Sequence, residues 1–489
     1  MADDNRTGKN SPSRGTGNAK KATRRPAGYT ANPTGASRSA AGGQARYHAD
    51  RPSPKRTEKP SGGARGRGQN GRQAQNGQSR QLASTGRREL VRTRAELRAL
   101  SDERKEREWQ SGVERVRGGV DKILLALILL LVTLGAIMVF SASYPTGLSE
   151  SGDGFKYLKK HLLYVGIGAV AMFAASFVPY RAYRRWGPFA AYGLALVLLA
   201  AVLVIGTSEG EAKRWIYIGS FSVQPSEIMK IALVLILAWY IDKYKDRMKN
   251  AVGFKEKFIY NTAIPFGFIA VACGMVMLEK HLSGTIILAL LGISVMLIGG
   301  CNLKYTLITS AIGGAAAVGI FIAKNPYALK RLLTFTAEDV DILGEGWQTH
   351  QGVLAIGSGG LFGLGFGQSN QKHSYVSMAH NDFIFSIWCE ELGFFGALFL
   401  IVLFVAFIWR GYVVAMRAPD TFSTLLVFGA VTQVGVQAFL NMMVVCDIIP
   451  NTGISLPFIS YGGSSLMMLM GEMGLILSIS RHFYRKKTI

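Results

Sequence analysis

Ten long apolar runs constrain this chain more than any other feature. They fall near residues 122–143, 162–179, 187–206, 223–242, 258–278, 283–300, 304–323, 382–408, 421–445 and 460–481. Runs of roughly 20 apolar residues are long enough to cross a bilayer core of about 30 Å. In lipid every backbone N–H and C=O must be bonded within the protein, and these runs are too long and too apolar for barrel strands. The sequence therefore predicts an all-α polytopic membrane protein, a bundle of ten transmembrane helices.

The charge of the chain is concentrated before the first run. The net charge is +24, and residues 1–120 contain 27 Lys/Arg but only 11 Asp/Glu. Residues 1–86 are rich in Gly, Ser, Arg, Asn and Pro, a composition typical of disorder. We expect them to form a disordered basic cytoplasmic tail near anionic membrane lipids, with no specific nucleic-acid partner. Residues 87–120 alternate charged residues with leucines and predict a charged juxtamembrane helix.

Basic residues between the runs predict the orientation, because Lys and Arg concentrate in cytoplasmic loops. With the tail inside, the cytoplasmic loops contain Arg181, Arg184, Arg185, Lys243, Lys245, Arg247, Lys249, Arg410 and Arg417. Ten spans return both termini to the cytoplasm. Residues 324–381 then form a large extracytoplasmic loop that we expect to be ordered. Its glycine-rich run at 355–367 predicts backbone packing against the membrane or a sugar rather than a nucleotide loop, since no G-K-[ST] follows.

Two charged residues enter the fourth run from its outer end. Glu227 and Lys230 are three residues apart in Gln224-Pro-Ser-Glu-Ile-Met-Lys, so they share one face of a helix. A simple anchoring ion pair would explain them. The alternative is a polar cavity open to the outside, in which Arg214 and Lys230 hold an anionic group such as a diphosphate. Arg214 could instead reach lipid phosphates.

The outer segments contain further polar candidates for substrate binding. They are Gln224, His281, Ser283, Gln348, Gln351, Lys372, His380, Ser460 and Ser464. For His281 a structural hydrogen bond is the simpler interpretation than catalysis. Glu338, Asp339 and Asp341 lack calcium-loop spacing and predict a solvated turn. We therefore expect no certain cofactor and assign no metal ligand, with a divalent cation left open. Gly and Pro in the segment 451–465 predict a bent re-entrant loop that lines a cavity.

The segment His380-Asn-Asp382-Phe-Ile-Phe leads into the eighth run. Asp382 stands at the outer mouth of that helix, where an aspartate is a good N-cap. A carboxylate that faces a partly dehydrated cavity would instead have a raised pKa and suit a general base. Glu390 and Glu391, deeper in the run, are interpreted as structural partners of polar groups on neighbouring helices.

Several of these segments resemble the SEDS family (shape, elongation, division and sporulation proteins; FtsW, RodA and SpoVE) over residues 121–483. The matching segments are Arg214-Trp-Ile, Gln224-Pro-Ser-Glu-Ile-Met-Lys230, Ala355-Ile-Gly-Ser-Gly-Gly-Leu-Phe-Gly363, His380-Asn-Asp-Phe-Ile-Phe385, Glu390-Glu-Leu-Gly393 and Leu456-Pro-Phe-Ile-Ser-Tyr-Gly-Gly463. The segment 449–457 and the pair Gln348 and Gln351 look more like the FtsW and SpoVE type than RodA.

The resemblance implies a peptidoglycan glycosyltransferase that polymerises lipid II on the outer face of the cytoplasmic membrane during division or sporulation. Asp382 would be its catalytic residue, and undecaprenyl diphosphate its leaving group. The implied partners are a class B penicillin-binding protein transpeptidase and other divisome proteins, at the division septum of a bacterium. Two alternatives remain from the sequence, a lipid II flippase and a non-catalytic division scaffold. Clustered charges at the outer rim argue against the first, since transporters carry ionisable residues near the midplane.

Overall fold

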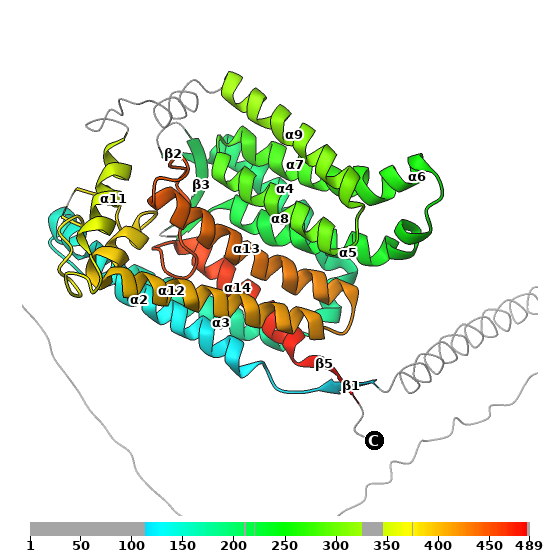
Figure 1. Cartoon of the computed structure of the whole chain (residues 1–489), viewed down its shortest axis with the longest axis horizontal. Coiled ribbons are helices and arrows are strands. Elements are labelled where there is room, and N and C mark those ends of the chain that lie inside the picture. The colour runs from blue at the N-terminus through cyan, green and yellow to red at the C-terminus, as the bar shows by residue number, and fades with distance from the viewer. Residues whose placement is uncertain (1–112, 210–211, 220, 325–345, 374, 487–489) are drawn as a thin grey trace, which may run out of the picture. The chain divides into compact units, whose positions relative to one another are not determined.

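A helix occupies every predicted span in the computed structural model, which describes residues 113–209, 212–219, 221–324, 346–373 and 375–486 (Figure 1). These helices are α2 (Lys122–Ser151), α3 (Lys156–Phe177), α4 (Tyr180–Ile205), α5 (Pro225–Asn250), α7 (Ile264–Leu278), α8 (Leu282–Ile298), α9 (Leu303–Lys324), α12 (Ile384–Arg417), α13 (Thr421–Val445) and α14 (Gly463–Ser480). The short helix α6 (Phe254–Phe258) and the π-helical turn η1 (Ile259–Ala263) lead directly into α7. The all-α prediction is confirmed.

Within the described residues, 8 helical segments are long and apolar enough to cross a membrane, counting α6 to α7 as one. Two of the ten predicted spans fall short by this measure. The helix α8 is apolar but has 17 residues. The helix α5 carries Glu227, Lys230 and Asp242 within its first 18 residues, so its start is too polar for a plain lipid-facing span.

The helices differ strongly in how much of their surface is covered. In α13 and α14, 67% of the spanning window is buried inside the protein, against 6% in α9. The helix α13 packs against α5, α8 and α12, and α14 packs along α3. Apolar side chains pointing inward from all of these helices form one continuous core. Polar residues on α5, α13 and α14 therefore lie in the protein interior rather than in lipid.

The two ends of the bundle have different chemistry. We name the end at which α2 begins the terminal end, and the opposite end the site end. At the terminal end Asp121 caps α2 by accepting from Leu124 N (2.9 Å) and pairs with Arg410 at 2.6 Å. Arg184 at the start of α4 pairs with Asp242 near the end of α5. The basic loops that predicted one membrane side thus meet at one end.

The strand β1 (Val113–Arg117) corrects part of the sequence prediction. It pairs antiparallel with β5 (His482–Lys486) at the terminal end, so these five residues do not belong to a juxtamembrane helix. Val113 and Val116 are β-branched residues, which are enriched in strands. The remainder of the predicted helix and the predicted tail lie outside the described residues.

Three features shape the site end. The short strands β2 (Thr207–Glu209), β3 (Ala212–Ile218) and β4 (Phe221–Val223) form a sheet between α4 and α5, which the sequence analysis did not predict. The helix α11 (Trp347–Ser358) precedes the glycine-rich run. Backbone bonds such as Leu364 N to Glu390 O (2.9 Å) attach that run to α12, and the helix breaks at Gly393 (φ 68°) to receive it. The glycines therefore serve close backbone packing against α12, whereas the sequence predicted packing against the membrane or a sugar.

The predicted re-entrant loop is present between α13 and α14. It reaches far into the bundle, because a Cβ atom on Gly135 of α2 would lie only 2.1 Å from Phe458 O. The ring of Phe458 contacts that of Phe407 in the middle of α12 (centroids 5.8 Å apart). The irregular backbone is tolerated here because it is surrounded by protein.

Candidate active site

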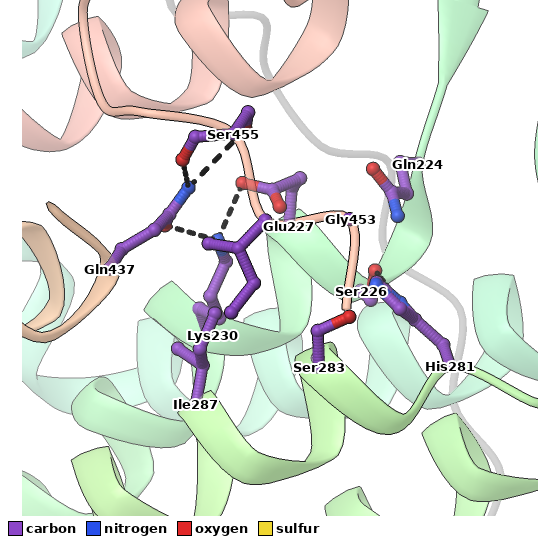
Figure 2. A pocket seen from close by; sticks show the side chains of 12 residues that line it. Gln224, Ser226, Glu227, Lys230, His281, Ser283, Ile287, Gln437, Gly453 and Ser455 are labelled. Atoms are coloured by element: carbon purple, nitrogen blue, oxygen red, sulfur yellow. Dashed lines mark hydrogen bonds and ion pairs between the residues drawn. The ribbon is translucent and has the colours of Figure 1, made fainter. Parts of the chain in front are cut away.

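A polar cavity of about 380 Å³ lies at the site end, between the starts of α5 and α8, the end of α13 and the re-entrant loop (Figure 2). Its wall contains Gln224, Ser226, Glu227, Lys230, His281, Ser283, Gly284, Ile287, Gln437, Gly453, Ile454 and Ser455. The helix α5 begins here because Pro225 occupies its first turn and needs no hydrogen-bond acceptor for a backbone N–H. One turn of α5 thus presents Ser226, Glu227 and Lys230 to the same space.

The charged centre of the cavity is an ion pair within α5. Lys230 Nζ lies 2.8 Å from Glu227 Oε2, and the two side chains are 4% and 12% exposed. Lys230 also donates to Gln437 Oε1 at 3.0 Å, and Ser465 donates to Glu227 Oε2 at 3.0 Å. An ammonium group has three donors, and these contacts use two of them. The ion pair therefore positions a cation that can still donate to an anion in the cavity.

The carboxylate of Asp382 lies beside Gly453 in the wall of this cavity. The N-cap of α12 is Phe383, without a side-chain capping bond, so Asp382 does not cap the helix. Gly453 forms part of the cavity wall, and a Cβ atom on it would lie 3.3 Å from Asp382 Oδ2. Asn441 Nδ2 donates to Asp382 O (2.7 Å) and to Ile454 O (2.6 Å). The helix α13 therefore fixes the carboxylate and the re-entrant loop relative to each other.

Arg214 of β3 is the second cation near this carboxylate. It donates from Nη2 to Lys280 O at 2.9 Å, which holds the strand against the turn between α7 and α8. Burial raises the pKa of Asp382 to about 6, and the charge of Arg214 opposes that rise. Asp382 is thus largely ionised at neutral pH and still basic enough to take up a proton.

Two further titratable groups in the turn between α7 and α8 respond to Arg214. Burial lowers the pKa of His281 to about 3, and Arg214 and Lys230 add to that effect. The imidazole is therefore neutral, and its Nδ1 lies 3.4 Å from Ser226 Oγ. Burial raises the pKa of Glu279 to about 8, which Arg214 opposes, and the side chain is 1% exposed. The ionised groups closest to the cavity are therefore Asp382, Glu227, Lys230 and Arg214.

The structure brings eight of the thirteen predicted site residues to the cavity or its vicinity. Gln224, Glu227, Lys230, His281 and Ser283 line it, and Asp382 adjoins it through Gly453. Ser464 lies just behind the wall, where its Oγ accepts from Gln224 N at 3.2 Å. Arg214 of β3 lies against the turn between α7 and α8, through its bond to Lys280 O. The two cations proposed to hold an anion, Arg214 and Lys230, are therefore at the same end of the bundle as the proposed base, Asp382.

Five predicted residues are engaged elsewhere. Lys372 is buried in an ion pair with Glu391 (2.8 Å), which also accepts from Ser141 of α2 at 2.6 Å. This is the structural role predicted for Glu391, whereas Glu390 binds the loop backbone at Asn370 N (2.9 Å). The ring of His380 packs against those of Tyr157 and Tyr461, 4.4 and 5.5 Å between centroids.

The other three of these residues make contacts within the loops. Ser460 Oγ accepts from Leu456 N at 2.7 Å. Gln348 donates to Ser377 O at 2.8 Å, and Gln351 is buried in α11. None of these contacts involves the cavity wall, so we assign these residues to the framework of the site.

Seven of the twelve wall residues were not among the predicted site residues, and two of these matter most for the site. Gln437 lies in the apolar run of α13, where an isolated amide is itself a signal of an interior polar contact. Gly453 is named only within the predicted loop, and its proximity to Asp382 follows from tertiary packing. Among the described residues, no group of three His, Cys, Asp or Glu side chains gathers as a metal site. The acidic segment 338–341 lies outside those residues.

The fold and the cavity together define a class: multi-pass membrane proteins with a charged polar site at one end of a helix bundle. Residues 121–485 match the FtsW/RodA/SpoVE family model, described as "Cell cycle protein". The chain belongs to this family.

Similarity to individual proteins covers nearly the whole length of each. Stage V sporulation protein E of Bacillus subtilis is 36% identical over 74% of this chain and 97% of its own. A probable peptidoglycan glycosyltransferase FtsW of Trichlorobacter lovleyi is 34% identical over 74% of this chain and 93% of its own. A chain from a peptidoglycan synthase complex that couples polymerization and crosslinking superposes with a TM-score of 0.60 at 26% identity, covering 74% of this chain and 98% of its own. The part of the chain before residue 121 lies outside the family match.

Proposed function

We propose that this chain is a peptidoglycan glycosyltransferase that polymerises lipid II at the site end of the bundle, with Asp382 as general base. The observation that carries the proposal is one basic carboxylate beside the wall of a polar cavity that contains Lys230, with Arg214 near enough for its charge to act on that carboxylate. The names of the relatives, which include probable peptidoglycan glycosyltransferases, supply the substrate class.

The chemistry follows from the positions of the charges. The carboxylate of Asp382 takes the proton from the 4-hydroxyl of the acceptor sugar as that oxygen bonds to the anomeric carbon of the donor. The bond between the anomeric carbon and the diphosphate oxygen breaks, and undecaprenyl diphosphate leaves. Lys230 and Arg214 stabilise the negative charge that develops on the diphosphate, in a buried site where such stabilisation is strong. A single displacement inverts the anomeric configuration.

The proposal includes an orientation. With the site end outside, the basic loops and the paired strands β1 and β5 face the cytoplasm, in keeping with the positive-inside tendency. A class B penicillin-binding protein would receive the new glycan strand on the outer side and crosslink it. The peptidoglycan synthase complex among the structural relatives supports this pairing. A role in division or sporulation, at the septum, is part of the same proposal.

The test is polymerisation of purified lipid II by the full chain together with its class B penicillin-binding protein, whose transpeptidase is inactivated. We expect glycan chains from the wild type and a rate lower by about 10²–10⁴ in Asp382→Asn, the usual contribution of a general base. Asp447→Asn is the control, since Asp447 is an exposed carboxylate just beyond α13.

Each alternative predicts a different result in the same system. Unchanged polymerisation by Asp382→Asn would remove the proposed base. A folded wild type that makes no polymer but moves lipid II across liposome membranes would be a flippase. If only the Asp382 variant loses polymer, a non-catalytic scaffold is excluded.

A further inference from the structure

A basic depression lies at the terminal end of the bundle, away from the candidate active site at the site end. The proposed function does not explain it. It lies between the start of α4 and the last turns of α5 and has a volume of about 1080 Å³. Its wall contains Arg181, Arg184, Arg185, Trp186, Phe189, Trp239, Asp242 and Lys243. Four cations thus face one carboxylate over an aromatic surface.

Within the part of the chain that the structure describes, only Arg184 among the four cations has a carboxylate within ion-pair distance. Arg184 forms the ion pair with Asp242 and lies 3.9 Å from Asp420. Among the described residues, no carboxylate lies within ion-pair distance of Arg181, Arg185 or Lys243, and all three are exposed. The depression therefore has a net positive charge that is available to an anion.

The floor of the depression is aromatic. The rings of Phe189 and Trp239 meet edge to face with centroids 4.4 Å apart, and Lys243 Nζ lies 4.6 Å from the centroid of Trp239. Trp186 is 70% exposed. Tryptophan beside basic residues is typical of the membrane–water interface, where its ring lies at the level of the headgroups.

An exposed apolar stripe continues from the depression along α4. Trp186, Phe189, Val197 and Val204 follow helical spacing on one face, and they are 70%, 46%, 65% and 78% exposed. A ligand that fills both features needs an anionic group for the depression and a long apolar chain for the stripe. Free phosphate has only the first of these, and a zwitterionic lipid has no net charge for it.

We propose that this depression binds the phosphate headgroup of an anionic phospholipid, such as phosphatidylglycerol, whose acyl chain lies along α4. Arg181, Arg185 and Lys243 contact the phosphate, and Trp186 and Phe189 contact the first part of the chain. Arg184 holds α4 to α5 and α13 and so shapes the site. Basic pockets between transmembrane helices at the cytoplasmic side are suited to such headgroups.

The experiment uses the full chain reconstituted in zwitterionic bilayers that contain a small fraction of phosphatidylglycerol. The probe is phosphatidylglycerol brominated on its acyl chain, which quenches nearby tryptophan fluorescence, compared with equally brominated phosphatidylcholine. We expect stronger quenching by the anionic lipid, and we expect Trp186→Phe to remove most of that difference. In Arg181→Gln/Arg185→Gln the apparent affinity should fall roughly thirtyfold, from the typical contribution of two basic residues near an anionic surface.

The control is Lys255→Gln/Lys257→Gln, which removes two exposed charges on α6 outside the depression and should leave the quenching unchanged. Equal quenching by both brominated lipids would overturn the proposal, as would an equal loss in the control. Competition by millimolar inorganic phosphate would show that the site takes a free anion and would also overturn it. Since the two arginines are exposed, the variants should fold, and an unchanged thermal transition verifies this.

Discussion

The substitution Gly453→Ala tests whether the position of Asp382, rather than its presence alone, sets the rate. Gly453 has φ +68°, and a Cβ atom there would lie 3.3 Å from Asp382 Oδ2. Two separable effects follow. The left-handed backbone costs an alanine about 1 kcal/mol. The new methyl group also stands a few tenths of an ångström inside the roughly 3.5 Å at which non-bonded atoms make favourable contact, so the carboxylate must move.

The expected loss of activity can be scaled from that displacement. A misplacement of 1 Å can cost about 100-fold in rate, so a shift of a few tenths should cost roughly threefold to tenfold. The assay is initial rate of lipid II polymerisation, with thermal unfolding measured on the same preparations. Lipid II binding should change little, because the two cations are untouched.

Gly152→Ala is a closely matched control. Gly152 caps α2 with φ +69° and has no atom within 4 Å of the position of a Cβ. It has the same backbone strain as Gly453 without the contact to a carboxylate. We expect both variants to lose similar stability and only Gly453→Ala to lose activity. An equal fall in rate in both variants would refute the reasoning, since the effect would then come from backbone strain alone.

Two further predictions concern charge. Because the base must be ionised and the pKa of Asp382 is about 6, kcat/KM should fall tenfold per pH unit below that value. Arg214→Gln should move this acidic limb of the pH profile to higher pH, because it removes the charge that opposes the effect of burial on the pKa. An acidic limb at the same pH in Arg214→Gln would contradict this. Lys372→Met should lower the free energy of unfolding by about 3 kcal/mol, because it leaves the buried carboxylate of Glu391 without its cation. Lys372→Met/Glu391→Gln should recover part of that loss when unfolding is measured in detergent. A double variant less stable than the single one would be inconsistent with a buried pair.

The local part of this structure could be predicted from sequence, because it depends on composition and spacing. Apolar runs located all ten helices, and the spacing of Glu227 and Lys230 correctly placed both on one face. The resemblance of the segment around Asp382 indicated the carboxylate, and the structure shows that Asp382 is not the cap of α12, while its role as a base stays a prediction.

What could not be predicted depends on partners far away in the chain. The charge of Lys372 gave no sign that Glu391 would pair with it, and a basic residue in an outer loop looked like a substrate contact. The strand β1 needs β5, more than 360 residues later, to form its backbone hydrogen bonds. An isolated segment of alternating charged residues offers a helix as the simpler prediction, since nothing local specifies the distant strand.

The arrangement of the cavity also explains why its charged residues are buried. A simple anchoring role does not explain the free energy needed to bury Glu227 and Lys230, because the desolvation of two ions can exceed their mutual attraction. Gln437 and Ser465 offset part of that cost through hydrogen bonds, and both come from helices other than α5. A network that joins three helices around a cation with a remaining donor is suited to an occupant that brings its own negative charge. The lipid-linked diphosphate of the proposed function would meet this requirement, since its diphosphate would bring the negative charge while its polyprenyl chain stays in lipid.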